Sequence, residues 1–423
     1  MTTHKREDAI TRKRIAIPTP KPPPPKDPIP HRQIWGGAAA LVAAMLLLFF
    51  VPRLLHGAGN SSSSIFKASA TATATSTPAP TATPAPQTPA QAWGAAAVTH
   101  VPLALPDGTT FVPSDISPDG KMLVGYTISS QTQQAPYDIV AVTLPNLSVE
   151  HLYTMPADAA PPTVRTDGTF VAWIGGNNYT GGTGQIHQII GFFNLPNRTY
   201  NILYDTYALQ FNPHVIAVAH GQFFWSPQNS PTQLNDIDMA TTNRTVVTPP
   251  NVILAFDAHP NIQVSWPYLL YMPADHVVHI YNMQTQQDHP LNVIAPLDVT
   301  TQLALVGDSV LWTAPATGTQ AGTMVEEIAH IDQPAPTAQT LLDIPNATSL
   351  TQLVATPRLI AWSDGMSFSA YDRQRQIFVT LHGVPQASFA VTPLAANGNQ
   401  LWYEADDNNQ PGIDVLDTTN LGG

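Results

Sequence analysis

The stretch Ser117–Tyr126 reads SPDGKMLVGY, a tight turn followed by a short strand that ends on an aromatic ring. Six further copies of this pattern follow, with 40 to 52 residues between consecutive aromatic positions. The seven aromatic residues are Tyr126, Trp173, Trp225, Tyr271, Trp312, Trp362 and Trp402. A period of this length is typical of the blades of a β-propeller. The repeat therefore predicts seven blades.

A second pair of strand-like stretches follows the aromatic in several copies, for example DIVAVTL and VEHLYTM within Asp138–Met155. Each unit thus supplies four strands. A single four-stranded sheet with two apolar faces is not stable alone, so we expect the sheets to stack radially with the aromatic rings between them. Six or eight blades also fit the period. A β-sandwich or two small barrels is the competing architecture for regularly spaced short strands.

The two ends of the repeat region are incomplete in complementary ways. The last unit supplies only three strands and ends at Gly412–Thr418, whereas an additional strand, Val98–Ala104, precedes the first unit. Unpaired strand edges promote association with other chains. We therefore expect Val98–Ala104 to complete the last blade and to close the ring. The predicted fold class is an all-β, seven-bladed propeller over residues 97–423.

The turn Ser117–Lys121, with the sequence SPDGK, resembles the WD40-like repeat of TolB-like propellers. Weaker copies of the turn occur at Asp167–Gly168 and at Gly221, and the resemblance covers about residues 97–423. It implies a propeller that makes protein contacts in the cell envelope. The chain departs from that family in having seven predicted blades instead of six, no α/β domain ahead of the propeller and a retained membrane anchor.

The N-terminal part of the chain has a different charge and composition. Residues 1–33 carry eight basic and three acidic side chains, and the next eighteen residues, Ile34–Val51, contain no charge. As a helix, that stretch spans about 27 Å, close to the thickness of a bilayer core. The basic flank orients the N-terminus toward the cytoplasm. We expect a single-pass membrane protein with an extracytoplasmic propeller; a signal peptide cleaved near Ala68–Ala70 is the alternative.

Low-complexity sequence lies on both sides of the predicted transmembrane helix, 34–52. The cytoplasmic tail, 1–33, contains the proline-rich segment Pro18–Pro30 and lacks the apolar residues that a folded domain needs. Residues 53–96 include a tract rich in Ser, Thr, Ala and Pro, which is typical of a semi-extended linker. The predicted organisation is a disordered tail, a membrane helix, a linker and a propeller.

Composition excludes several functions. Beyond Arg53 the chain carries eight basic and 26 acidic residues, so this part is repelled by phosphate backbones and nucleic acid is not an expected partner. The sequence contains no cysteine, which rules out disulfides, thiolate metal sites and thiol nucleophiles.

Neither a catalytic nor a cofactor-binding nor a metal site is predicted, because the sequence contains none of the common hydrolase, metalloprotease, P-loop or dinucleotide signatures. Four groups contain residue types that bind metal ions or phosphate in other proteins: the pairs His276/His279 and Glu327/His330, the acidic run Asp406–Asn409, and the glycine run Gly181–Gly184. In each of them a purely structural role is favoured. Residues i and i+3 of a strand face opposite sides, so neither pair predicts a metal site. The acidic run lacks the ligand spacing of a calcium loop, and the glycine run lacks the helix that follows a phosphate loop.

Recognition is expected on the longest loops, because variable loops on a rigid scaffold usually carry binding. In each blade the second turn lies on the face opposite the first and third turns. Several second turns are long and polar: Ile128–Ala135, Gly175–Gly184, Pro227–Thr232, Ala314–Gly322 and Ala405–Pro411.

The function predicted from these features is a non-catalytic, membrane-tethered propeller that binds or scaffolds a protein, peptide or envelope glycan. One alternative is a propeller enzyme, such as a glycan hydrolase or lyase, with carboxylates gathered at the channel mouth from different blades. The other is a sensor ectodomain that signals to the cytoplasmic tail.

Overall fold

The computed structural model confirms the seven-bladed propeller. All residues that the structure describes belong to one compact unit, residues 81–423. The described ranges are 86–129, 136–159, 161–175, 185–209, 216–225, 234–247, 263–271, 277–291, 301–315, 322–331, 333, 337–345, 350–383, 393–407 and 410–422.

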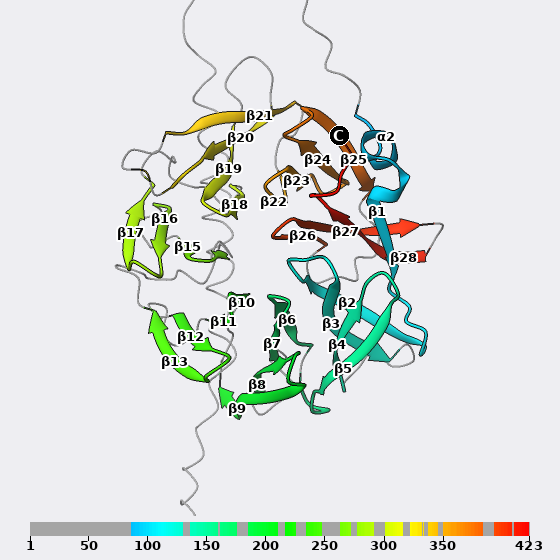
Figure 1. The fold of residues 1–423 in the computed structure, drawn as a ribbon, viewed down its shortest axis with the longest axis vertical. Helices are drawn as coiled ribbons and strands as arrows, with labels where there is room; N and C mark the ends of the chain where they lie inside the picture. Colours follow the sequence, from blue (N-terminus) through cyan, green and yellow to red (C-terminus); the bar gives the residue numbers. More distant parts are fainter. Residues whose placement is uncertain are drawn as a thin grey trace, which may run out of the picture. The chain divides into compact units, whose positions relative to one another are not determined.

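Each blade is a four-stranded antiparallel sheet (Figure 1). Blades 1 and 2 are β2 (Thr109–Ile116), β3 (Met122–Ser129), β4 (Asp138–Thr143) and β5 (Ser148–Thr154), then β6 (Thr163–Thr166), β7 (Phe170–Gly175), β8 (Gln185–Asn194) and β9 (Thr199–Leu209). Blades 3 and 4 are β10 (Ile216–Ala219), β11 (Gln222–Trp225), β12 (Leu234–Asp238) and β13 (Asn243–Val247), then β14 (Gln263–Ser265), β15 (Tyr268–Tyr271), β16 (His279–Asn282) and β17 (Gln287–Pro290). Blades 5 and 6 are β18 (Leu303–Val306), β19 (Ser309–Pro315), β20 (Gly322–Ile328) and β21 (Gln339–Pro345), then β22 (Gln352–Ala355), β23 (Leu359–Ser363), β24 (Ser367–Asp372) and β25 (Ile377–Gly383).

Blade 7 contains strands from both ends of the propeller. Its inner strands are β26 (Leu394–Asn397), β27 (Gln400–Asp407) and β28 (Gln410–Asp417), and its outer strand is β1 (Val98–Pro102). β1 pairs antiparallel with β28, with Val98 opposite Leu416 and Pro102 opposite Gly412. The predicted closure by the N-terminal strand is therefore confirmed. The innermost strands of consecutive blades contact one another, and the contact between β2 and β26 completes the circle.

The core consists of seven apolar clusters, and each cluster lies between two consecutive blades. The seven aromatic residues of the repeat all lie on the second strand of their blades and are buried, with exposed fractions from 0 to 7%. Trp173, for example, is fully buried and stacks on Tyr153 of the preceding blade. This arrangement agrees with the expectation that large rings fill the space between sheets, and it excludes a β-sandwich.

The sequence SPDGK forms the first turn of blade 1. Ser117 Oγ donates to Asp119 Oδ1 at 2.7 Å and accepts a hydrogen bond from the Met122 amide at 3.0 Å. Gly120 has a φ of 71°, which favours glycine, and lies so close to the Gln400 amide of blade 7 that a Cβ would require this side chain to shift. The motif is therefore a tight turn that also packs against the neighbouring blade.

Residues 87–97 pack on blades 6 and 7, although sequence analysis assigned them mostly to the linker. Gln87 forms a parallel bridge with Val379 of the outer strand β25. The short helix α2 (Pro89–Trp93) follows, and its capping box joins Thr88 and Gln91. After the 3-10 turn η2 (Ala95–Ala97), the chain enters β1. The folded part of the chain thus begins before residue 97.

A buried ion pair joins this segment to the C-terminal residues. Asp372 is fully buried and accepts hydrogen bonds from Trp93 Nε1 at 2.9 Å and from Arg358 Nη2 at 2.9 Å. Arg358 Nη1 donates to the Leu421 carbonyl at 2.7 Å. We call these four residues the clasp, because they hold together α2, blade 6 and the chain that follows β28.

No described helix is long and apolar enough to cross a bilayer. The predicted membrane segment Ile34–Val51, the tail 1–33 and most of the predicted linker lie outside the described residues. Gly181–Gly184, His276 and the centres of the long second turns also lie outside them.

Candidate functional site

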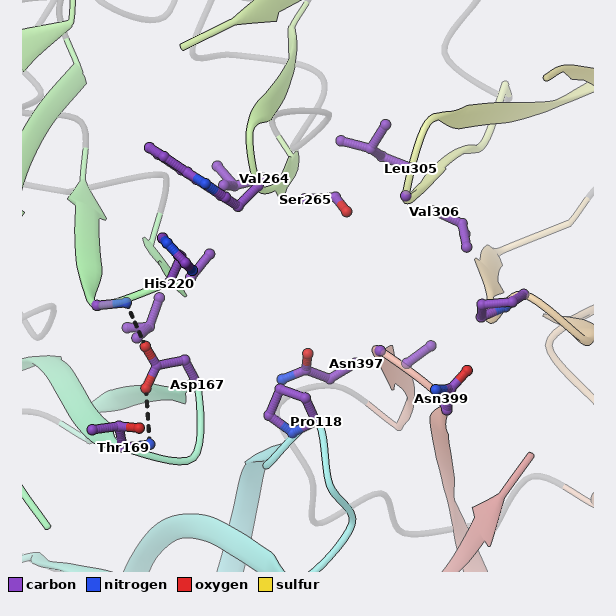
Figure 2. Close-up of a pocket in the computed structure, with 18 of the residues that line it drawn as sticks. Pro118, Asp167, Thr169, His220, Val264, Ser265, Leu305, Val306, Asn397 and Asn399 are labelled. Carbon is purple, nitrogen blue, oxygen red and sulfur yellow. Dashed lines mark hydrogen bonds between the residues drawn. The ribbon is translucent and has the colours of Figure 1, made fainter. Parts of the chain in front are cut away.

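A cavity of about 760 Å³ opens at the centre of the ring, on the face formed by the first turns of the blades. All seven blades contribute to it (Figure 2). The residues that line it are Pro118, Asp167, Thr169, Phe170, Val218, Ala219, His220, Gly221, Val264, Ser265, Trp266, Leu305, Val306, Gly307, Ala355, Pro357, Ala396, Asn397, Gly398 and Asn399. We call this cavity the mouth. Its volume lies within the range of small-molecule sites in proteins, about 300–1,000 Å³.

The mouth contains one carboxylate among its described lining residues, that of Asp167. Asp167 Oδ1 accepts hydrogen bonds from the amides of Thr169 and Phe170 at 3.0 and 2.8 Å, and Oδ2 accepts one from the Gly221 amide at 2.7 Å. Two of these bonds are visible in Figure 2. The side chain thus shapes its own turn and joins blade 2 to blade 3. Its charge is already stabilised by three N–H donors.

Two flat rings form part of the wall where blades 3 and 4 meet. The His220 imidazole and the Trp266 indole have their centroids 5.5 Å apart and their planes inclined by 14°. His220 is exposed, whereas Trp266 is half-buried and also stacks on the buried Phe224. Each ring belongs to the first turn of its blade, so turn geometry and core packing together fix the pair at the cavity edge.

Amide and hydroxyl groups complete the wall. Asn397 Nδ2 donates to the Ile116 carbonyl at 2.7 Å and to the Thr166 carbonyl at 3.3 Å, which joins blade 7 to blades 1 and 2. The side-chain oxygens of Asn397 and Ser265 point into the open space (Figure 2). The mouth therefore offers neutral hydrogen-bonding groups beside an apolar and aromatic surface.

Asp115 lies next to the mouth on β2 and is buried. Burial raises the pKa of its carboxyl group, although the charge of Arg165 and the amide donors of Thr166 and Ile116 act in the opposite direction. Its two oxygens accept hydrogen bonds from Ile116 and Thr166 at 2.9 and 3.0 Å. The side chain is thus a structural bridge between the inner strands of blades 1 and 2, and it does not line the cavity.

The residues considered as metal ligands in the sequence have structural partners instead. His279 Nδ1 lies 2.8 Å from Asp288 Oδ2, Glu327 pairs with Arg373 at 2.8 Å, and His330 Nδ1 lies 2.7 Å from Asp308 Oδ2. No cluster of three or more histidine or acidic side chains suited to a metal ion occurs within the described part of the chain. Asp406 and Asp407 lie at the end of β27, and the two asparagines after them are outside the described residues.

Sequence reasoning placed recognition on the long second turns, and these remain largely outside the described residues. The mouth lies on the opposite face. The sequence contained a signal for the mouth. His220 and Trp266 directly precede Gly221 and Pro267, which begin the repeated turn-and-strand pattern in blades 3 and 4. In a closed ring, the residues at that position of every blade converge on the centre.

Comparison with solved structures finds distant matches. An oligogalacturonate lyase in complex with manganese is 11% identical, with a TM-score of 0.49 over 76% of this chain and 90% of that chain. The WD40 repeats of RRP9 are 10% identical, with a TM-score of 0.43 over 77% and 99% of the two chains. A chain of a mitotic checkpoint complex is 12% identical, with a TM-score of 0.43 over 74% and 94%. No protein-family model and no curated protein matches the sequence.

Proposed function

We propose that this propeller is a non-catalytic binding module and that the mouth holds its ligand. The observation that carries this proposal is the cavity of about 760 Å³ that the first turns of all seven blades build together. Its described polar side chains are amides, hydroxyls and the His220 imidazole, and its one described carboxylate accepts hydrogen bonds from three amides. Such a site can orient a ligand by hydrogen bonds and ring contacts.

The competing proposal, a glycan hydrolase or lyase, needs different groups. Glycoside hydrolysis generally uses two carboxyl groups about 5 to 10 Å apart, one of which has a raised pKa. Among the described residues of the mouth, Asp167 has no such carboxyl partner. Asp115, whose pKa is raised, accepts hydrogen bonds from the Ile116 amide on its own strand and from the Thr166 amide on β6 of blade 2, so its oxygens have structural partners. The described geometry therefore supports binding better than acid and base catalysis.

The cellular setting of the proposal comes from the sequence. We propose that Ile34–Val51 anchors the chain in the cell membrane, with the basic tail in the cytoplasm and the propeller outside. The ligand would then be a protein, a peptide or a glycan of the cell envelope. The excess of acidic residues beyond Arg53 argues against nucleic acid as the ligand. No described feature specifically favours signalling to the tail.

The test is ligand capture by the full-length chain in detergent. A Ser265→Trp variant fills the mouth with a large ring, and a Tyr200→Ala variant is the control, because Tyr200 lies on the outer strand of blade 2 and is 57% exposed. A specific envelope ligand should be retained by the wild type and the control and lost from the Ser265→Trp variant. Equal capture by all three proteins, or chemical conversion of the captured ligand, would contradict the proposal.

A further inference from the structure

We propose, on the basis of the function proposed above, that the ligand of the mouth is an uncharged oligosaccharide that packs against the His220–Trp266 pair. The proposal identifies which of the candidate ligand classes, protein, peptide or glycan, the site fits. It rests on three properties of the described wall: its charge, its shape and its combination of flat rings with amide and hydroxyl groups.

The charge of the mouth disfavours ionic ligands. No lysine or arginine is among its described lining residues, and the chain beyond Arg53 carries eight basic against 26 acidic residues. An anionic polysaccharide would therefore be repelled at long range and would find neither lysine nor arginine among the described residues of the wall. A cationic ligand would meet only Asp167, whose oxygens already accept three amide hydrogen bonds. An uncharged ligand incurs neither cost.

The shape of the mouth favours a compact ligand. Seven turns surround the cavity on all sides, so its rim is closed instead of forming a groove that crosses the surface. Extended proline-rich peptides bind along open, aromatic-lined grooves that accept several residues in a row. A short chain of sugar rings fits within a cavity of about 760 Å³ whose rim is closed, whereas an extended peptide would have to continue beyond the rim.

The wall chemistry matches the two kinds of surface on a sugar ring. The C–H groups of a sugar face form an apolar surface that packs on a flat aromatic ring, and the hydroxyl groups around its edge need donors and acceptors. His220, the exposed member of the stacked pair, supplies the flat surface, because the Trp266 ring already stacks on His220 and on the buried Phe224. The Asn397 and Ser265 oxygens, which point into the same space in Figure 2, supply polar partners.

The experiment uses the full-length chain and a panel of defined probes. The uncharged probes are trisaccharides of glucose, mannose and N-acetylglucosamine, the anionic probe is trigalacturonate, and the peptide probe is a neutral proline-rich decapeptide. Binding is measured by calorimetry for the wild type and for the His220→Asn, Ser265→Trp and Tyr200→Ala variants. His220 has a φ of 53°, which asparagine tolerates, so His220→Asn removes the ring with little backbone strain. Thermal unfolding verifies that each variant is folded.

The expected result is binding of at least one uncharged trisaccharide. His220→Asn should weaken that binding by about three- to tenfold, Ser265→Trp should abolish it, and Tyr200→Ala should leave it unchanged. Binding of the peptide or of trigalacturonate in place of the uncharged sugars, with the same dependence on the mouth variants, would overturn this inference but support the proposed function. If no probe binds, or if binding is the same in wild type and mouth variants, the inference fails. Ligand capture that Ser265→Trp does not reduce would in addition overturn the proposed function.

Discussion

The interface between blades 6 and 7 and the interface between blades 3 and 4 are built in different ways. Among the described residues, fourteen are buried in the apolar cluster between blades 6 and 7, and five are buried in the cluster between blades 3 and 4. The first interface also contains the clasp with its buried ion pair. At the second, the strands of blade 4 are three or four residues long and the His220–Trp266 stack lies at the rim.

This difference indicates that the interface between blades 6 and 7 contributes mainly to stability, whereas the interface between blades 3 and 4 carries the proposed ligand contact. Buried apolar area and buried hydrogen bonds are the main sources of stability. We therefore expect the interface between blades 6 and 7 to resist local unfolding more than the interface between blades 3 and 4. The rings proposed to contact the ligand lie in the sector with fewer described core residues. Binding sites are commonly drawn from the less stable part of a fold, because they must adjust to a ligand.

Removal of β1 is expected to have the largest effect. A chain that starts at residue 105 lacks the outer strand of blade 7, including the fully buried Val101, and exposes the edge of β28. We expect it to lose cooperative thermal unfolding and to aggregate. A chain that starts at residue 86 should unfold at the same temperature as the whole chain. A chain that starts at residue 97 lacks α2 and should unfold at an intermediate temperature. Identical unfolding of all three would contradict the closure described above.

The Asp372→Ala variant tests the clasp itself. The change leaves Arg358 largely buried, with 13% of its side chain exposed, and removes its carboxylate partner. We expect the free energy of unfolding to fall by about 3–5 kcal/mol. The control is Glu150→Ala, because the Arg198–Glu150 pair is 74% and 34% exposed. Its loss should cost less than about 1 kcal/mol. Similar losses in chemical denaturation would mean that burial of the ion pair has no special effect.

The pH dependence of the clasp follows from the same contacts. Burial by itself raises the pKa of Asp372, but the hydrogen bonds from Arg358 and Trp93 outweigh it, and the pKa lies below its ordinary value. A lowered pKa stabilises the fold above the ordinary value of 3.8, and this contribution is lost as the pH falls through the lowered pKa. The difference in stability between wild type and Asp372→Ala should therefore shrink only in strong acid.

Hydrogen exchange compares the two sectors directly. We expect the amides of β14, β15 and β16 to exchange on the order of tenfold faster than those of β23, β24 and β27, because fewer described residues are buried between blades 3 and 4 than between blades 6 and 7. The measurement is exchange of the full-length chain followed by mass spectrometry. Equal protection of both sectors would show that the difference in described core residues has no energetic counterpart.

The smallest expected effect concerns Asp236, on β12 in blade 3. Burial raises the pKa of this carboxyl group to about 6, and its Oδ1 has no hydrogen-bond partner among the described residues. A raised pKa means that the folded state binds the proton more tightly, so this group favours folding increasingly as the pH falls from 7 through 6. We expect a gain on the order of 1 kcal/mol between pH 7 and 5, reduced by partial solvent screening. The Asp236→Asn variant should lack that gain, which denaturant titrations at the two pH values would measure.

The architecture was predictable because each blade repeats a local signal. Trp173, Trp312 and Trp402 follow their turns at nearly constant distance, and the ring emerges once these aromatic positions are aligned. The folded segment ahead of β1 was also signalled locally, since Thr88, Pro89 and Gln91 form a capping box with proline at the start of the helix. The Ser, Thr and Pro content around it concealed that signal.

The candidate site was not predictable from any single stretch. His220 and Trp266 are 46 residues apart, and Asn397 lies 131 residues beyond Trp266, so no local motif connects them. They converge only because the ring brings the first turns to one centre. Most residues of the long second turns, which length and polarity favoured for recognition, lie outside the described residues. Recognition on those turns therefore stays a prediction.

The pairing of Val98 with Leu416 joins positions 318 residues apart in the chain. During synthesis, β1 emerges before the other propeller strands and has no pairing partner until β28 has been made. Contacts between such distant segments form slowly, and unpaired edges attract other chains in the meantime. Production of this protein in the cell should therefore benefit from a chaperone that shields β1 until β28 has been synthesised.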